Sequence, residues 1–102
     1  MFSQESDIVK TMRLIEELKA ELIFDIGELY KDLAIGCGKI RQEILAKMIV
    51  NCYILGKRLG IDFVEMDENV KSTLKRRISD NNDLEKRFGD FSKLARHLDN
   101  KR

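Results

Sequence analysis

The chain has 102 residues, a length that suits one domain with a single modest core. Hydrophobic residues make up 43% and charged residues 36%, and Pro and Trp are absent, so the composition favours ordered helices. The net charge of +1 gives the whole chain no electrostatic case for nucleic acid, and no apolar run of 18 residues predicts a membrane span.

The charges are unevenly divided along the chain. Residues 1–35 hold eight acidic and four basic residues, whereas the remainder holds ten acidic and fifteen basic ones. Opposite excesses of this kind attract each other, within one chain or between two copies. The division therefore favours self-association over a foreign partner.

Two further features bear on the compartment. The N-terminus shows no basic stretch followed by an apolar one, so we expect no secretory signal. Cys37 and Cys52 do not form a C-x-x-C pair, and they predict reduced thiols rather than a disulfide framework. We therefore expect a cytoplasmic protein.

The first predicted element is a long helix over residues 6–34. Its apolar residues recur in steps of three and four, which is the period of one helix face. The members of this apolar stripe are Ile8, Met12, Ile15, Leu18, Leu22, Ile26, Leu29 and Leu33. Gly36 and Gly38 follow the stripe and predict the end of the helix.

Four shorter helices are predicted after this turn, over residues 39–59, 63–79, 83–88 and 91–99. The first of them carries its own apolar face, on which Cys52 is expected to be a core residue, and it ends at Gly60. Asp62 and Glu65 have the spacing of a capping box for the next helix. Asp90 or Ser92 is expected to cap the last one.

The sequence thus predicts an all-α fold, a long helical hairpin followed by shorter C-terminal helices in a single domain over residues 1–102. A helix of about 29 residues is about 43 Å long, whereas a compact domain of this size has a radius of gyration of about 13 Å. A hairpin of two such helices cannot bury both apolar faces by itself. We therefore expect a homodimer in which two hairpins form a four-helix bundle.

Four acidic residues stand at helical spacing along the first predicted helix: Glu21, Asp25, Glu28 and Asp32. Carboxylates that converge can hold Mg²⁺ for phosphate chemistry. A row of charges on a helix is more typical of a face turned to solvent, and on these grounds we expect a solvated outer face. The middle of the second predicted helix offers no acid, only Lys47 and Asn51.

A basic cluster stands near the end of the third predicted helix and consists of Lys71, Lys75, Arg76 and Arg77. Such a cluster binds nucleic acid when more positive surface backs it. Cations are also favoured at the C-terminal end of any helix, and we prefer this explanation and expect no nucleic-acid partner. His97, the single histidine, is placed where an imidazole suits the helix dipole, and nothing in the sequence marks it as catalytic.

The segment LAKMIVNCYILGKRLGIDF resembles the part of the MazG-type, all-α nucleoside triphosphate pyrophosphohydrolases in which a helix ends in a Leu-Gly-Ile-Asp turn. The upstream segment LIEELKAELIFDIGELYKDL resembles the helix that bears their first acidic motif. The segments DIVKTMRLIEELKAEL, YILGKRLGIDF and LEKRFGDFSKLARHL are similar to a small MazG-like group from Gram-positive bacteria. The resemblance covers most of the chain and implies a MazG-like four-helix bundle.

The resemblance also implies which residues hold a metal in active relatives, where an E-x-x-E pair on one helix and an E-x-x-D pair on the next bind Mg²⁺. The Gly-Glu-Leu step aligns the first pair with Asp25 and Glu28. The Leu-Gly-Ile-Asp turn aligns the second pair with Ile44 and Lys47, so half of the metal motif is lost. Two carboxylates alone bind Mg²⁺ poorly. Gly27, inside the first pair, predicts either close packing of a second helix or inheritance from an active ancestor.

Our leading hypothesis is a catalytically degenerate MazG-like module, dimeric, without a cofactor or a membrane partner, that binds an unidentified protein or a ligand such as a nucleotide. The alternative is a Mg²⁺-dependent pyrophosphohydrolase that converts a nucleoside triphosphate to the monophosphate and pyrophosphate, using Asp25 and Glu28 with help from Glu21 or Asp32. A nucleic-acid-associated regulator that uses the basic cluster is a third, weaker hypothesis. If Lys47 contacts the acidic pair in the folded chain, an ion pair has replaced the metal.

Overall fold

The computed structural model describes residues 2–36, 38, 40–80 and 82–100, and the side chains of these from residue 6 onward. This part of the chain holds α-helices and no strand, which confirms the all-α prediction. The helices are α1 (Phe2–Ile35), α2 (Arg41–Arg58), α3 (Phe63–Asp80), α4 (Asp83–Phe88) and α5 (Asp90–Asp99). None of them is both long and apolar enough to cross a membrane.

The contacts divide the chain into two compact units, residues 1–63 and residues 64–102. The first unit is the hairpin of α1 and α2, and the second holds α4, α5 and nearly all of α3. The prediction of a single domain over the whole chain stays a prediction. Each unit is described by itself below.

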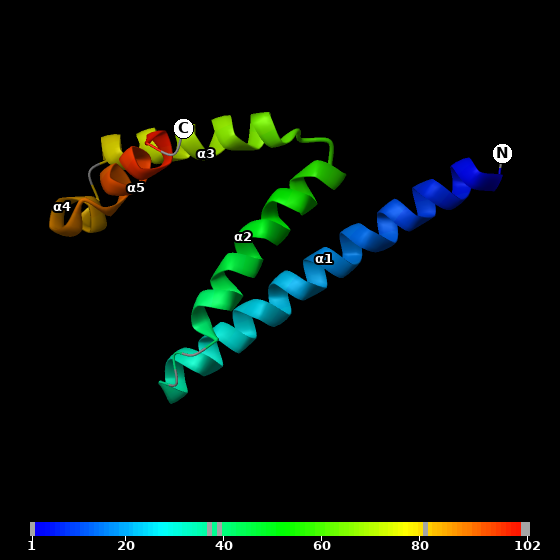
Figure 1. Cartoon of the computed structure of the whole chain (residues 1–102), viewed down its shortest axis with the longest axis horizontal. Helices are drawn as coiled ribbons and strands as arrows, with labels where there is room; N and C mark the ends of the chain where they lie inside the picture. Colours follow the sequence, from blue (N-terminus) through cyan, green and yellow to red (C-terminus); the bar gives the residue numbers. More distant parts are fainter. Residues whose placement is uncertain (1, 37, 39, 81, 101–102) are drawn as a thin grey trace. The chain divides into compact units, whose positions relative to one another are not determined.

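In the first unit, α1 and α2 pack against each other as an antiparallel hairpin (Figure 1). α1 has 34 residues and begins four residues before the predicted start, whereas α2 has 18 residues. At 1.5 Å per residue α1 is about 51 Å long and α2 about 27 Å. α2 therefore covers only the C-terminal part of α1.

The end of α2 follows from its sequence. The amide of Ile61 donates to the carbonyl of Gly56 at 2.8 Å, and Gly60 adopts a φ of +95°, which an L side chain rarely adopts. The helix therefore ends where Gly60 predicts. α3 begins directly after Asp62, whose carboxylate accepts a hydrogen bond from Lys57 Nζ at 2.8 Å.

The packing of the hairpin differs from the expectation in one respect. Asp25 and Asp32 on α1 are buried, together with Ile44 on α2, while Ile26 and Leu33 of the apolar stripe are more than half exposed. Glu21, Asp25, Glu28 and Asp32 form an acidic row, which occupies the face of α1 next to the apolar stripe. The acidic row, rather than the stripe, is turned to α2. Cys52, expected in the core, is exposed.

Gly27 lies on the side of α1 turned away from α2. A Cβ atom built on Gly27 meets no other atom within 4 Å. Close packing of α2 therefore does not explain this glycine, and that part of the prediction is wrong for the described chain.

In the second unit, α4 and α5 are joined at Gly89. The N-terminal end of each helix is capped by a side chain, Asn82 for α4 and Glu85 for α5. The side chain of Asn82 accepts a hydrogen bond from the amide of Glu85 at 3.1 Å, which caps α4. The carboxylate of Glu85 accepts hydrogen bonds from the amides of Phe91 and Ser92 at 3.1 and 3.2 Å. The cap of α5 is therefore Glu85, and not Asp90 or Ser92 as predicted.

Candidate functional site

The acidic row of α1 lies in the seam between α1 and α2. Asp25 is 2% exposed and Asp32 is 5% exposed, and Glu21 and Glu28 are partly buried. The prediction of a solvated outer face is therefore wrong. Burying a carboxylate costs free energy unless a cation or several hydrogen-bond donors compensate its charge. We therefore looked for the compensating groups on α2, the facing helix.

The first compensating cation is Lys47, in the middle of α2. Its Nζ lies 3.1 Å from Asp25 Oδ1 and 3.1 Å from Glu21 Oε2. The hydrogen bonds to Asp25 and, next, to Glu21 raise the pKa of Lys47 above its ordinary value. The Lys47 side chain is 46% exposed, whereas the Asp25 side chain is buried, so this ion pair lies at the solvent-facing edge of the seam.

The second compensating cation is Arg41, in the first turn of α2. Arg41 Nε donates to Asp32 Oδ2 at 2.9 Å, and this acceptor carboxylate is almost fully buried while the Arg41 side chain is 37% exposed. Asp25 and Asp32 are seven residues apart, which is two helical turns, so both face α2. Each buried carboxylate of α1 thus meets a cation of α2.

Two polar atoms of the seam lack a partner. Asp25 Oδ2 and Asn51 Nδ2 are buried and make no hydrogen bond among the described residues. Asn51 follows Lys47 by one helical turn and lies on the side of α2 that faces α1, as does the buried Ile44. The seam is therefore acidic on α1, and cationic, amide-bearing and apolar on α2.

The seam carboxylates Asp25 and Asp32 pair with cations of α2 in this structure. Mg²⁺ would instead need near-octahedral oxygen ligands at about 2.0–2.1 Å, most often from carboxylates and water. In the described part of the chain no three His, Cys, Asp or Glu side chains gather around one point. The two motif positions on α2 are an apolar Ile44 and the Lys47 ammonium, which already holds Asp25 Oδ1.

Glu28 stands apart from these ion pairs. It lines a shallow hollow of about 180 Å³ near the hairpin turn, together with Lys31, Asp32, Ile35 and Ile40. The structure therefore brings Asp25 together with Glu21 through Lys47, and places Glu28 beside Asp32. Cys37 and Lys39, between α1 and α2 in the sequence, lie outside the described residues.

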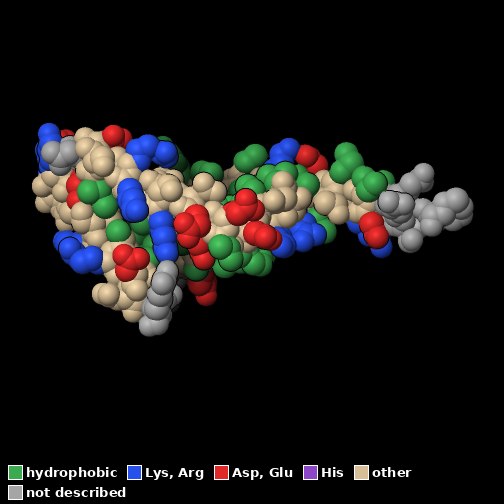
Figure 2. Space-filling view, turned by 90° about the horizontal axis from the view of Figure 1, so that it is seen from above, with side chains coloured by type: hydrophobic (Ala, Val, Ile, Leu, Met, Phe, Trp, Pro, Cys, Tyr) green, Lys and Arg blue, Asp and Glu red, His purple; other side chains and the backbone are tan. Residues whose placement is uncertain are grey.

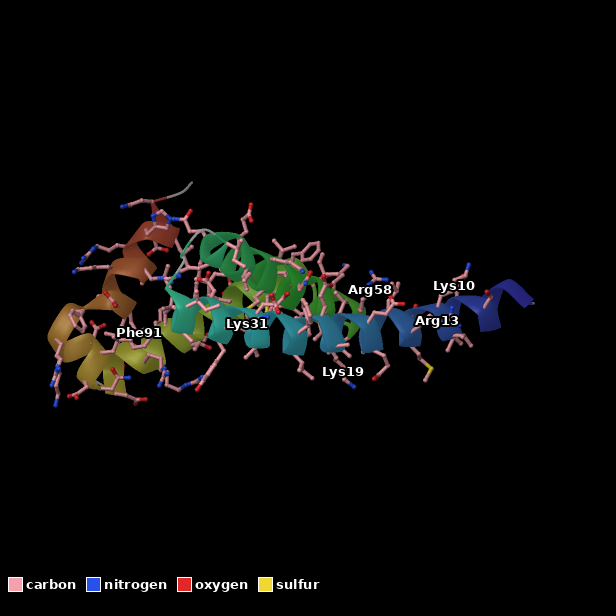
Figure 3. All side chains as sticks on the ribbon, turned by 90° about the horizontal axis from the view of Figure 1, so that it is seen from below. Lys10, Arg13, Lys19, Lys31, Arg58 and Phe91 are labelled. Carbon is pink, nitrogen blue, oxygen red and sulfur yellow. The ribbon has the colours of Figure 1, made fainter. Side chains whose placement is uncertain are left out.

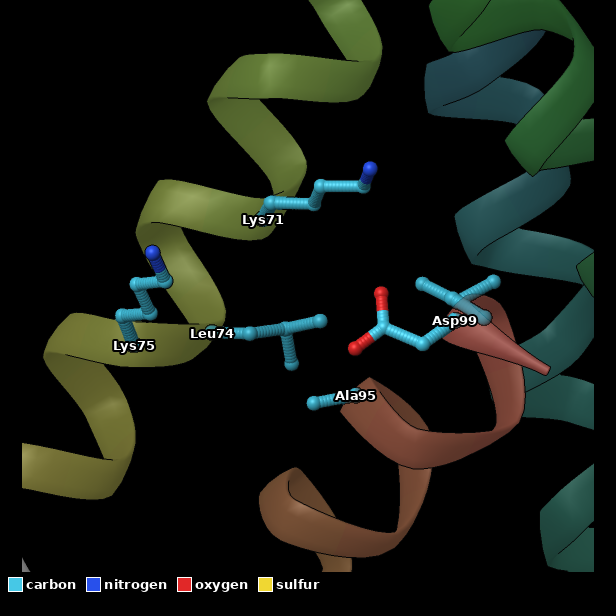
Figure 4. Close-up of a pocket in the computed structure, with 6 residues that line it drawn as sticks. Lys71, Leu74, Lys75, Ala95 and Asp99 are labelled. Atoms are coloured by element: carbon cyan, nitrogen blue, oxygen red, sulfur yellow. The ribbon is translucent and has the colours of Figure 1, made fainter.

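The basic cluster of the second unit is divided by the helix. Lys71 and Lys75 line a hollow of about 280 Å³ together with Leu74, Ala95, Leu98 and Asp99. Figure 4 shows the Asp99 side chain pointing into the space between α3 and α5. The Arg77 guanidinium lies over the Phe91 ring at 5.2 Å, as a cation–π contact. Arg76 is exposed. The structure thus brings Lys71 and Lys75 together at the hollow and places Arg77 on Phe91.

Comparison with known proteins agrees with this picture of the fold. The model of the MazG-like family matches residues 8–91, which is most of the chain. The chain belongs to the MazG-like family. No curated protein and no solved structure matches it. The matched region of this MazG-like chain contains α2, most of α1 and the seam residues from Glu21 to Lys47.

The contact between Arg41 and Asp32 went unpredicted, although the sequence carries a signal for it. In an antiparallel hairpin, facing residues have numbers with a constant sum. Asp32 and Arg41 give 73, and Asp25 and Lys47 give 72, so one register brings both pairs together. The Gly turn at residues 36 and 38 fixes the centre of that register, and Arg41 could have been found from it.

Proposed function

We propose that this MazG-like chain has exchanged the catalytic metal site of its family for ion pairs and acts as a dimeric interaction or ligand-binding module. The single observation that supports the proposal is the position of Lys47 Nζ, 3.1 Å from both Asp25 and Glu21. An ammonium at that point supplies the positive charge that a divalent ion would otherwise bring to these carboxylates. Without such an ion, the phosphates of a bound nucleotide lack their counter-charge.

The proposal includes no resident cofactor, no membrane partner and a cytoplasmic location. The target is an unidentified protein or a small ligand such as a nucleotide. Because 21 large hydrophobic side chains of the described residues are exposed in the single chain, association is the part of this function with the broadest support.

The experiment is a pyrophosphate-release assay against all canonical and several modified nucleoside triphosphates, with Mg²⁺ or Mn²⁺. We expect release no faster than in the buffer control for the native protein. The matched variants are Glu28→Ala, at the motif position, and Glu16→Ala, an exposed acid of the same helix whose Oε2 pairs with Lys19. Release by the native protein that Glu28→Ala abolishes and Glu16→Ala leaves intact would overturn the proposal.

That result would instead support the second candidate, a Mg²⁺-dependent pyrophosphohydrolase that uses Asp25 and Glu28 with Glu21 or Asp32. Family membership favours this candidate, because the family suggests the superfamily of nucleoside triphosphate pyrophosphohydrolases. Activity would then require Lys47 to leave Asp25 before a metal binds. An enzyme of this kind should be faster as Lys47→Gln than as the native chain, and the same assay measures this difference.

A further inference from the structure

The uncovered surfaces of the molecule differ in how narrowly they define a partner. The apolar surface of the hairpin, visible toward the N-terminal end of α1 at the right of Figure 2, belongs to the association already proposed. In the second unit, a hollow of about 270 Å³ lined by Met66, Val70 and Leu94 among others has no charged side chain in its lining. The hollow lined by Lys71 and Lys75 combines apolar and charged groups, and this combination specifies the chemistry of a ligand.

This hollow opens between two helices that run antiparallel. Arg77, near the end of α3, lies over the ring of Phe91, near the start of α5 (labelled in Figure 3), at 5.2 Å. Lys71, earlier on α3, lines the hollow with Leu98 and Asp99, near the end of α5. We call this site the lysine hollow, and it is lined by Lys71, Leu74, Lys75, Ala95, Leu98 and Asp99 (Figure 4).

The apolar part of the lysine hollow includes the best-buried side chain of the second unit. Leu74 is 6% exposed and is the one buried hydrophobic residue among the described residues of this unit. Ala95 and Leu98 are partly buried beside it. An apolar side chain placed against these three residues is removed from water, which favours binding.

The charged part of the lysine hollow consists of Lys71, Lys75 and Asp99. Within the described residues none of these three belongs to an ion pair. Lys71 and Lys75 are four residues apart, which is about 6 Å along the axis of α3. Two acidic residues at positions i and i+4 of a second helix have the same spacing. The two ammonium groups therefore match an acidic pair on a helix.

The shape of the lysine hollow also favours a helix over a small molecule. Its volume of about 280 Å³ is below the range of about 300–1,000 Å³ that is typical of small-molecule pockets. A shallow hollow between two helices instead suits the apolar face of an amphipathic helix, which places side chains at i, i+3, i+4 and i+7 into such grooves.

We propose that the lysine hollow binds an amphipathic helix of a partner protein that carries two acidic residues four positions apart beside its apolar face. The inference rests on the proposed function, because an interaction module needs a surface that selects its partner, and it names the class of that partner. The apolar face of the helix covers Leu74, and the two carboxylates pair with Lys71 and Lys75. A basic residue beside the acidic pair suits Asp99. The exposed ion pairs contribute more to selectivity than to affinity.

The test uses the full chain and three synthetic peptides of about 20 residues, long enough to form a helix. The first peptide carries leucines at i, i+3, i+4 and i+7 with a pair of glutamates four positions apart beside them. The second has lysines in place of the glutamates, and the third has alanines in place of the leucines. Binding is measured by nuclear magnetic resonance, from the amides of Leu74, Ala95 and Leu98. We expect the first peptide to bind at least about tenfold more tightly than the other two.

Four variants of the chain locate the site, at about 0.15 M salt so that distant charges are screened. For the first peptide, Lys71→Gln should weaken binding about threefold, and Lys71→Gln with Lys75→Gln about tenfold. Asp99→Asn should strengthen binding about twofold, because it removes a carboxylate that repels the glutamates. Lys93→Gln is the matched control, since Lys93 is exposed and lies on the side of α5 turned away from Ala95. It should change the affinity less than twofold.

Three peptide results would overturn the inference: no shift of the three amides at millimolar peptide, equal affinity for the second peptide, or equal losses for Lys71→Gln and Lys93→Gln. A lower mass in light scattering for the double lysine variant than for the native chain would assign the hollow to a second copy and would also overturn it. None of these results depends on nucleotide hydrolysis. Failure of peptide binding would overturn this inference alone, and release of pyrophosphate would overturn the proposed function alone.

Discussion

The two units of the molecule hold their carboxylates in different ways. In the hairpin, Asp25 and Asp32 are buried and meet cations of the facing helix, at 3.1 and 2.9 Å. In the second unit, Glu85 meets the amides of Phe91 and Ser92, only six and seven residues further along the chain. The hairpin carboxylates therefore depend on tertiary packing, whereas Glu85 depends on a local turn. The difference predicts how each unit responds to mutation and to pH.

The largest effect is expected when a cation of the seam is removed. Arg41→Met leaves the carboxylate of Asp32 buried without its partner, which should lower the free energy of unfolding by about 3 kcal/mol. This is the lower end of the range for buried pairs, because the Arg41 side chain is 37% exposed. Urea unfolding followed by circular dichroism measures the difference.

Lys19→Met is the matched control, since the Lys19–Glu16 pair is exposed at both ends and should cost less than about 1 kcal/mol. Adding Asp32→Leu to Arg41→Met should restore most of the lost stability, because no unpaired charge remains in the seam. If Arg41→Met and Lys19→Met lowered the free energy of unfolding equally, the buried seam pair would contribute no more than an exposed ion pair.

The second unit should respond to acid through Glu85. Hydrogen bonds from Ser92 hold the pKa of Glu85 below its ordinary value of 4.5. A carboxyl group with a lowered pKa in the folded state contributes stability above its unfolded pKa, and this contribution is lost as the pH falls through the folded pKa. The helical circular-dichroism signal of α4 and α5 in the native chain should therefore decrease as the pH is lowered below about 4.5.

Glu85→Gln should lose this acid transition, because the amide carries no charge to protonate. Its stability at neutral pH should be lower than that of the native chain, since charge-assisted hydrogen bonds are replaced by neutral ones. Chemical shifts of the Phe91 and Ser92 amides along a pH titration report the change. If the native chain and Glu85→Gln gave the same titration, the claim that the Glu85 carboxylate stabilises the second unit would be wrong.

The smallest effect is expected on the outer side of α1, away from either kind of contact. Gly27→Ala introduces a Cβ atom that meets nothing within 4 Å. The gain in helix propensity should stabilise the chain by up to about 1 kcal/mol, seen as a higher melting temperature. A loss of stability instead would show that another surface packs on Gly27.

The helices could be predicted because their periodicity and turn residues are local. The spacing of apolar residues in steps of three and four predicted α1, and Gly60 predicted the end of α2. The rotation of α1 could not be predicted, because the acidic row and the apolar stripe are neighbouring faces and the usual preference places the stripe inside. The partner surface decides which face turns inward, and that depends on Lys47 and Arg41 standing opposite Asp25 and Asp32.

The candidate site was predictable in its chemistry rather than in its geometry. Aligning the family motif placed Lys47 where a metal-binding carboxylate is expected, and the structure places its Nζ beside Asp25. The second carboxylate at Lys47 is Glu21, one turn before Asp25, rather than Glu28. The cap of α5 was missed since Asp90 and Ser92 are nearer candidates than Glu85.

The most direct test of the central claim is a titration of the native protein with Mn²⁺, followed by electron paramagnetic resonance of the free ion. Because Lys47 supplies the positive charge at Asp25 and Glu21, we predict no saturable binding at millimolar Mn²⁺. Saturable binding that Asp25→Asn abolishes and Asp7→Asn, at an exposed acid of α1, leaves unchanged would contradict the account and return the seam to metal chemistry.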